Sequence, residues 1–159
     1  MQFRGPDAAL CFIEVAKLRL LKGGEAQALI SEAKELQPAN LLLRWLEARA
    51  LLGAGKYAEA RLIFEALATV DPYTLISDLS YDKRILGAWA LAEAAYCAFQ
   101  MGCYPESERR YRHAEALEPD CVEFRVKRQL AGIRAAETVS IRTQRPGELG
   151  NRNVCGADN

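Results

Sequence analysis

The sequence predicts an all-α fold in which three helical hairpins stack into a right-handed superhelix and a further helix caps the array. Three segments share one pattern: a small residue, a large apolar or aromatic residue four positions later, an apolar or small residue at seven and proline at twelve. Such a segment suits the second helix of a stacked hairpin, because the small residue admits a neighbouring helix and proline ends the helix. The pattern is carried by Ala26, Ile30, Ala33 and Pro38; by Ala60, Phe64, Leu67 and Pro72; and by Ser107, Tyr111, Ala114 and Pro119.

The spacing of the three prolines predicts repeated units with one insertion. Pro38 and Pro72 are 34 residues apart, and Pro119 follows 47 residues later. A period of 34 residues is typical of stacked helix-turn-helix units, so the third interval indicates about 13 extra residues. We therefore expect one domain over residues 1–140, with repeats at about 7–38, 41–72 and 82–119 and a capping helix at 120–139.

The first four helices are delimited by glycine, proline and a capping residue. The first begins at Gly5-Pro6-Asp7, since proline is favoured in the first turn of a helix, and it ends at Gly23-Gly24. Asn40 has the short polar side chain that caps a helix start, and it precedes the third helix. The second, third and fourth helices are expected at about 25–36, 41–52 and 57–70.

Three further helices are expected after an insertion at residues 73–79. A long helix should run from about Asp82 to Met101, where Gly102 ends it, and the sixth helix should occupy residues 105–117. Asp120, with Glu123 three residues later, resembles a capping box at the start of a seventh helix. No stretch alternates with a period of two, so we expect no sheet.

The seventh helix is expected to cap the array, because a terminal repeat needs a polar outer face. Its apolar stripe is expected to face the repeats, and its basic residues to face solvent. The stripe comprises Val122, Val126, Leu130 and Ile133, and the basic residues are Arg125, Lys127, Arg128 and Arg134. Residues 141–159 are rich in turn-forming residues and poor in apolar ones, so we expect a disordered tail there.

Two units resemble tetratricopeptide repeats. Gly55-Lys56-Tyr57-Ala58-Glu59-Ala60, followed by Phe64 and Asp71-Pro72, is similar to the second half of such a repeat. Gly102-Cys103-Tyr104-Pro105-Glu106-Ser107, followed by Tyr111, Ala114 and Glu118-Pro119, resembles another. In the first unit Ala26 follows Gly23 by three positions instead of five, so its turn should be about two residues shorter. The resemblance covers residues 7–139 and implies a binding role, since the family occurs in chaperone adaptors, secretion chaperones, regulatory proteins and appendages of enzymes.

The third unit and its insertion also resemble the repeat region attached to some bacterial glycosyltransferases. The residues that carry this resemblance are Ile76-Ser77-Asp78, Ser80-Tyr81-Asp82-Lys83-Arg84, Trp89-Ala90, Arg112-His113-Ala114-Glu115-Ala116-Leu117 and Phe124-Arg125-Val126-Lys127-Arg128. In those enzymes the repeats accompany a separate nucleotide-sugar domain, for which this chain has no room. The resemblance therefore implies a freestanding relative or partner of such enzymes.

Composition argues against several other functions. The 159 residues include 21 basic and 21 acidic side chains, without the basic excess typical of nucleic-acid binding. No apolar run approaches the roughly 18 residues of a membrane span, and nothing resembles a signal peptide, so we expect a cytoplasmic protein without membrane insertion. The five cysteines form no C-x2-C pair, and His113 is the only histidine. We therefore expect no metal site, no cofactor and no enzyme activity.

The first helix of each hairpin is expected to line the concave face of the array. Residues at positions i, i+3, i+7 and i+10 lie on one stripe of a helix. Counted back from the loop glycine of each first helix, these positions select a mainly apolar and aromatic set with two basic members. The set comprises Leu10, Ile13, Lys17, Leu20, Leu42, Trp45, Arg49, Leu52, Trp89, Ala92, Tyr96 and Phe99. From it we predict a partner-binding groove formed by Lys17, Leu42, Trp45, Arg49, Trp89, Tyr96 and Phe99. The alternative for each aromatic residue is packing between helices or cover by the chain's own C-terminal helix.

These observations predict a protein-interaction module. Aromatic anchors and arginine are typical of binding hot spots and of carboxylate recognition, so we expect a protein or peptide partner with an acidic group. Two alternatives stay open: an accessory module of a bacterial glycosyltransferase system, and a small secretion-type chaperone.

Overall fold

The computed structural model describes residues 6–71 and 82–144, and all regular structure in these ranges is helical. This confirms the predicted all-α class. The helices are α1 (Pro6–Leu21), α2 (Gln27–Leu36), α3 (Leu41–Gly53), α4 (Tyr57–Ala68), the short 3-10 helix η1 (Lys83–Leu86), α5 (Ala88–Gln100), α6 (Tyr104–Leu117) and α7 (Val122–Gln144). The predicted insertion at 73–79 lies outside the described residues.

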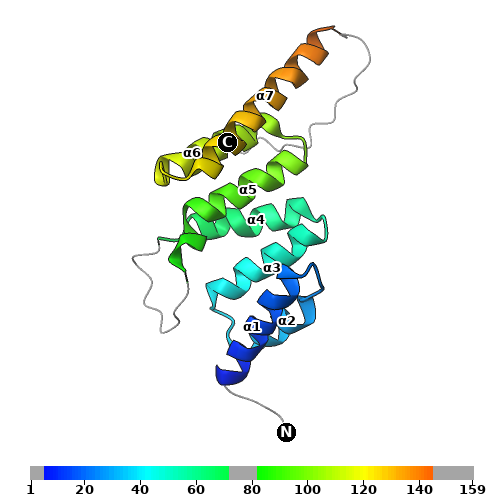
Figure 1. Cartoon of the computed structure of the whole chain (residues 1–159). Helices are drawn as coiled ribbons and strands as arrows, with labels where there is room; N and C mark the ends of the chain where they lie inside the picture. The colour runs from blue at the N-terminus through cyan, green and yellow to red at the C-terminus, as the bar shows by residue number, and fades with distance from the viewer. Residues whose placement is uncertain (1–5, 72–81, 145–159) are drawn as a thin grey trace.

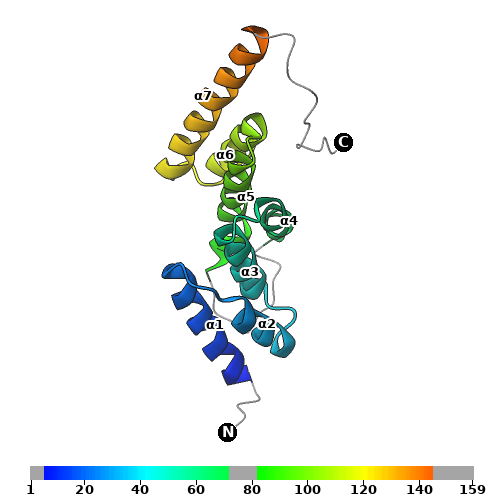
Figure 2. The same cartoon turned by 90° about the vertical axis from the view of Figure 1, so that its right-hand side faces the viewer.

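Helices that follow one another in the chain pack side by side. The pairs α1–α2, α3–α4 and α5–α6 form antiparallel hairpins, α4 packs on α5, and α6 packs on α7. Figures 1 and 2 show the resulting elongated stack, with α1 and α2 at one end and α7 at the other. In both views the last turns of α7 project beyond α5 and α6.

The first helix of every hairpin ends in the same glycine turn. Gly23, Gly55 and Gly102 have φ values of 69°, 75° and 77°, a left-handed conformation that favours glycine. In each turn the amide after the glycine donates to the carbonyl five residues earlier, at N···O distances of 2.8, 2.9 and 2.9 Å. This is the Schellman arrangement, which satisfies carbonyl groups left free at a helix end. The prediction of a shorter first turn is wrong: residues 22–26 separate α1 from α2, whereas only residues 54–56 and 101–103 separate the later pairs. Ala26 is the N-cap of α2, so this helix lacks the turn that precedes the small residue in α4 and α6.

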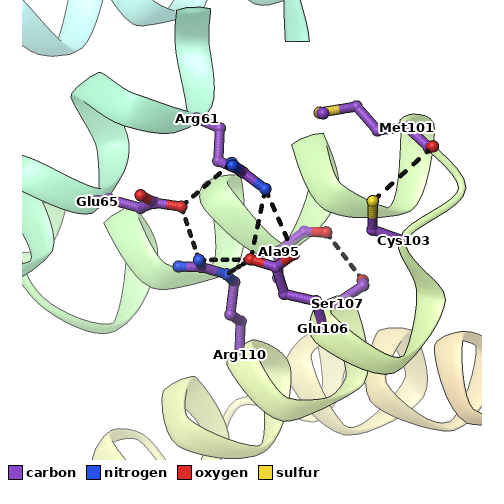
Figure 3. Close-up of polar contacts among 8 residues, drawn as sticks. All are labelled: Arg61, Glu65, Ala95, Met101, Cys103, Glu106, Ser107 and Arg110. Carbon is purple, nitrogen blue, oxygen red and sulfur yellow. Dashed lines mark hydrogen bonds and ion pairs between the residues drawn. The ribbon is translucent and has the colours of Figure 1, made fainter. Parts of the chain in front are cut away.

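The small residues that define the repeats are buried between helices. Ala26, Ala60 and Ser107 are at most 2% exposed. Ala60 shares a cluster with Ala48 of α3, and the Ser107 hydroxyl donates to the Ala95 carbonyl of α5 at 2.8 Å (Figure 3). Each small side chain therefore marks a close approach of two helices, as the spacing predicts.

A closed ring of alternating charges joins α4 to α6 (Figure 3). Arg61 lies 3.3 Å from both Glu65 and Glu106, and Arg110 lies 2.7 Å from Glu65 and 2.6 Å from Glu106. These four side chains are partly shielded from water, so their mutual attraction is screened less than that of exposed pairs. This ring of ion pairs therefore links α4 to α6, the second helices of neighbouring hairpins.

Two predicted boundaries are wrong. The helix expected at 82–101 is interrupted at Gly87, whose φ of −117° and ψ of −112° are not helical, and it divides into η1 and α5. Glycine is among the weakest helix formers, so a break at this position costs little helix-forming free energy. Leu86, next to the break, is fully buried. At the other end, α7 continues to Gln144, so residues 141–144 are helical instead of belonging to a disordered tail. Residues 145–159 lie outside the described residues.

The predicted inner face of α7 is also wrong. Val122, Val126, Leu130 and Ile133 are exposed by 46% to 63%, and α7 instead packs through Phe124 and Ala131, which are buried. The reason lies in the partners that the other helices provide. The Phe124 ring meets Trp89 of α5 edge to face at 5.2 Å. Next to Ala131, Gly132 faces Glu108 of α6, and a Cβ added at Gly132 would lie in ordinary contact with the Glu108 carboxylate, 3.5 Å away.

Basic residues of α7 that were expected in solvent instead hold this helix against α6. Arg128 and Arg125 donate to the Glu115 carboxylate at 2.7 and 3.1 Å. Hydrogen bonds from these two residues, Arg128 first, lower the pKa of Glu115. Arg125 also donates to the Pro119 carbonyl at 3.1 Å. Charge and aromatic contacts therefore determine which face of α7 is inward, although the outward face is the more apolar.

Candidate binding surface

One stripe of α5 contains its charged residue and two of its three partly exposed aromatic residues. Trp89, Glu93, Tyr96 and Gln100 follow one another at intervals of four, three and four residues, which places them on one side of the helix. Most other residues of α5 are buried alanines packed against α4, α6 and α7, and Cys97 is buried with them. Because the small residues of α5 are used for packing, its large and polar side chains are concentrated on the remaining face.

The neighbouring face of α3 continues this surface. Leu42 and Trp45 are half-buried and Arg49 is exposed, all on one stripe. The Arg49 guanidinium donates to the Glu93 carboxylate of α5, which joins the two stripes directly. The Trp45 ring packs edge to face on the buried Phe64, with ring centroids 5.1 Å apart, so one side of the indole belongs to the core.

On the other side of α5, two contacts join the stripe to α7. The Lys127 ammonium lies 5.9 Å from the centre of the Tyr96 ring, within reach of a cation–π interaction, and 2.6 Å from Glu123. Trp89 packs on Phe124, and its indole Nε1 is buried without a hydrogen-bond partner among the described residues. We call this surface the α3/α5/α7 face and define it by Leu42, Trp45, Arg49, Trp89, Glu93, Tyr96 and Lys127.

The α3/α5/α7 face includes five of the seven residues predicted for the groove. Lys17 lies on α1, where its ammonium is 2.7 Å from Glu14 of the same helix. Phe99 packs on Tyr104, with ring centroids 5.1 Å apart, at the turn between α5 and α6. Each of these two residues therefore has a contact that does not involve Arg49 or Glu93.

Sequence reasoning missed Glu93 and Lys127. Helical spacing allows either Ala92 or Glu93 to follow Trp89 on the same stripe. The predicted set contains Ala92, which is buried. The signal that would have selected Glu93 is its charge, because it is opposite to that of Arg49 on the preceding first helix. Lys127 was assigned to a solvated face because the partner ring of Tyr96 belongs to another helix.

Both basic residues of this face already have an acidic partner in the free protein. Arg49 is paired with Glu93 of the face, and Lys127 with Glu123, which adjoins the face on α7. An acidic ligand must displace the Glu93 carboxylate in order to bind Arg49. Such competition would exchange one carboxylate for another and would leave the aromatic residues to supply most of the binding free energy.

The Cys97 thiol lies in the core cluster and is held in its protonated form. Burial raises the pKa of Cys97 from 9.0 to about 12, and the Glu93 carboxylate adds to the rise. No group of three or more metal-ligating side chains occurs among the residues that the structure describes. None of the described helices is both long and apolar enough to cross a membrane.

Comparison of the chain with protein-family models, with curated proteins and with solved structures finds no match.

Proposed function

We propose that this chain is a protein-interaction module, built from three tetratricopeptide-like hairpins, that binds a peptide or partner segment on the α3/α5/α7 face. The observation that carries the proposal is the continuity of this face across three helices. Arg49 and Glu93 join α3 to α5, and Tyr96 and Lys127 join α5 to α7. The equal glycine turns of α1, α3 and α5 support equivalent repeats, in which these first helices share one side of the stack.

The chemistry of the face defines the kind of partner. Partly exposed tryptophan and tyrosine rings provide flat apolar area at a low cost in side-chain entropy. Arg49 offers a planar donor pair that suits a carboxylate, once Glu93 is displaced. The proposed ligand is therefore a peptide segment with aromatic or aliphatic anchors and one acidic group, bound without a cofactor.

The test is selection of peptides from a random displayed library on the full-length protein, followed by affinity measurements with two matched variants. Arg49→Glu and Arg44→Glu change the same residue type on the same helix, and both side chains are exposed. They lie on different sides of α3, because five residues correspond to about 140° of helical rotation. Only Arg49 belongs to the proposed face.

Arg49→Glu is expected to weaken binding of a selected acidic peptide by at least about tenfold, whereas Arg44→Glu should leave the dissociation constant unchanged. Tyr96→Ala should also weaken binding, since it removes a central aromatic anchor. Equal affinities for wild type and all three variants would contradict the proposed face, as would a library that yields no binding peptide.

A further inference from the structure

The two ion pairs at the α3/α5/α7 face differ in how firmly their carboxylates are held. Arg49 and Glu93 join two helices, and the Arg49 side chain is 45% exposed whereas that of Glu93 is 19% exposed. The carboxylate therefore lies deeper than the guanidinium, which a ligand can reach from solvent. Lys127 and Glu123, in contrast, lie on one helix and are both at least 40% exposed, so their attraction is weak.

The backbone of Glu93 is fixed by the packing of α5. Ala92 and Ala94 on either side of it are buried, and α5 packs against α4 and α6. The Glu93 charge also acts on the core, because it adds to the raised pKa of Cys97. A displaced Glu93 carboxylate therefore stays within one side-chain length of Arg49. A competing group attached to the same scaffold acts at a high effective concentration.

We propose that Glu93 is a built-in competitor that occupies Arg49 in the free protein and determines which partner segments bind. The inference rests on the proposed function of the α3/α5/α7 face. A segment that offers only an acidic group gains no net ion pair, since it replaces one carboxylate by another and leaves Glu93 beside a like charge. Such a segment is therefore rejected.

The aromatic residues next to the pair supply what the exchange of carboxylates lacks. Trp45 lies one turn before Arg49 on α3, and Tyr96 lies one turn after Glu93 on α5. A segment whose apolar anchor contacts these rings brings binding free energy from outside the ion pair. The preferred partner therefore carries its acidic residue close in sequence to an aromatic or aliphatic anchor.

Glu93→Gln, with Glu47→Gln as the matched control, tests the proposal. Glutamine keeps the size of the side chain and can accept a hydrogen bond from Arg49, but it has no charge. Glu47 lies on α3, is 23% exposed and pairs with Lys34 of α2 at 2.8 Å, so its replacement also removes a shielded carboxylate that joins two helices. It faces away from Arg49, because two residues correspond to about 200° of helical rotation. Circular dichroism and urea unfolding check that both variants remain folded.

The same random peptide library is selected on the full-length wild type and on both variants. Isothermal titration calorimetry then measures each selected acidic peptide and a counterpart in which the acidic residue is replaced by its amide. Glu93→Gln is expected to bind the acidic peptides about threefold to tenfold more tightly than wild type, and Glu47→Gln to match wild type. The change from acid to amide in the peptide should weaken binding to Glu93→Gln by a similar factor and change binding to wild type little.

The outcomes separate this inference from the proposed function. Equal or weaker binding of acidic peptides by Glu93→Gln would overturn the competitor and leave the proposed face intact. A gain shared by Glu47→Gln, or by the amide peptides, would do the same, because neither depends on the charge that faces Arg49. A library that yields no binding peptide on any of the three proteins would overturn the proposed function and the competitor together.

Discussion

Replacement of Ala60 by leucine tests whether the repeated small residues set the distance between helices. Ala60 has no exposed surface and packs in a cluster with Ala48 of α3 and with Phe64 and Leu67 of its own helix. Leucine adds three carbon atoms at this contact, and overpacking of this kind costs about 1–3 kcal/mol. The cost is a substantial part of a total stability that is commonly about 5–15 kcal/mol.

The expected change in melting temperature follows from the size of the chain. The entropy of unfolding is about 2.1 cal/mol/K per residue, which corresponds to about 0.33 kcal/mol/K for a chain of this length. A loss of 1–3 kcal/mol therefore lowers the melting temperature by about 3–9 °C. Thermal and urea unfolding, both followed by far-ultraviolet circular dichroism, provide two independent measurements of the loss.

Glu59→Leu is the matched control for this experiment. The Glu59 side chain is 61% exposed and lies 3.9 Å from Lys56, an exposed pair that contributes little. Its replacement should change the stability by no more than about 0.5 kcal/mol. If Glu59→Leu destabilised the protein as much as Ala60→Leu, or if Ala60→Leu were neutral, small residues would not determine the helix spacing.

Two further predictions concern buried polar groups. Ser107→Ala should cost about 1 kcal/mol, because it removes a buried hydrogen bond to Ala95, whereas Thr69→Val, which removes an exposed bond of the same 2.8 Å length, should be close to neutral in urea unfolding. The raised pKa of Cys97 predicts a contribution to stability that is complete below pH 9 and is lost as pH rises from about 9 towards 12, because the thiol ionises in the unfolded chain before it does in the folded one. Cys97→Ala should reduce this fall in a pH series of unfolding curves, and an identical fall in the variant would contradict the assignment.

The face of α7 that packs inward could not be predicted from its own sequence. An amphipathic pattern indicates the face with the most apolar area, which on α7 includes Leu130 and Ile133. The helix instead turns Phe124 towards Trp89, and Arg128 towards Glu115. Those partners lie on α5 and α6, so the choice depends on contacts between helices that a pattern within one helix does not contain.

For the candidate surface, too, the sequence predicted local features but not the contacts between helices. The sequence indicated that Trp45, Arg49, Trp89 and Tyr96 lie on the first helices of their hairpins, because helical spacing before a glycine stop is a local property. It did not indicate that Arg49 is neutralised by Glu93. The break at Gly87 also escaped prediction, since a single glycine is tolerated in many helices.

By itself, the sequence determined that the described chain is helical, that three hairpins turn at glycine, and that the repeated small residues Ala26, Ala60 and Ser107 are buried. These features follow from short-range rules: glycine adopts positive φ at low cost, proline ends helices, and a period near 3.6 selects a face. Only the tertiary structure decided which face of α7 is covered, which carboxylate meets Arg49, and which apolar stripe remains exposed. Each of these depends on side chains that are distant in the chain and become neighbours only when the hairpins stack.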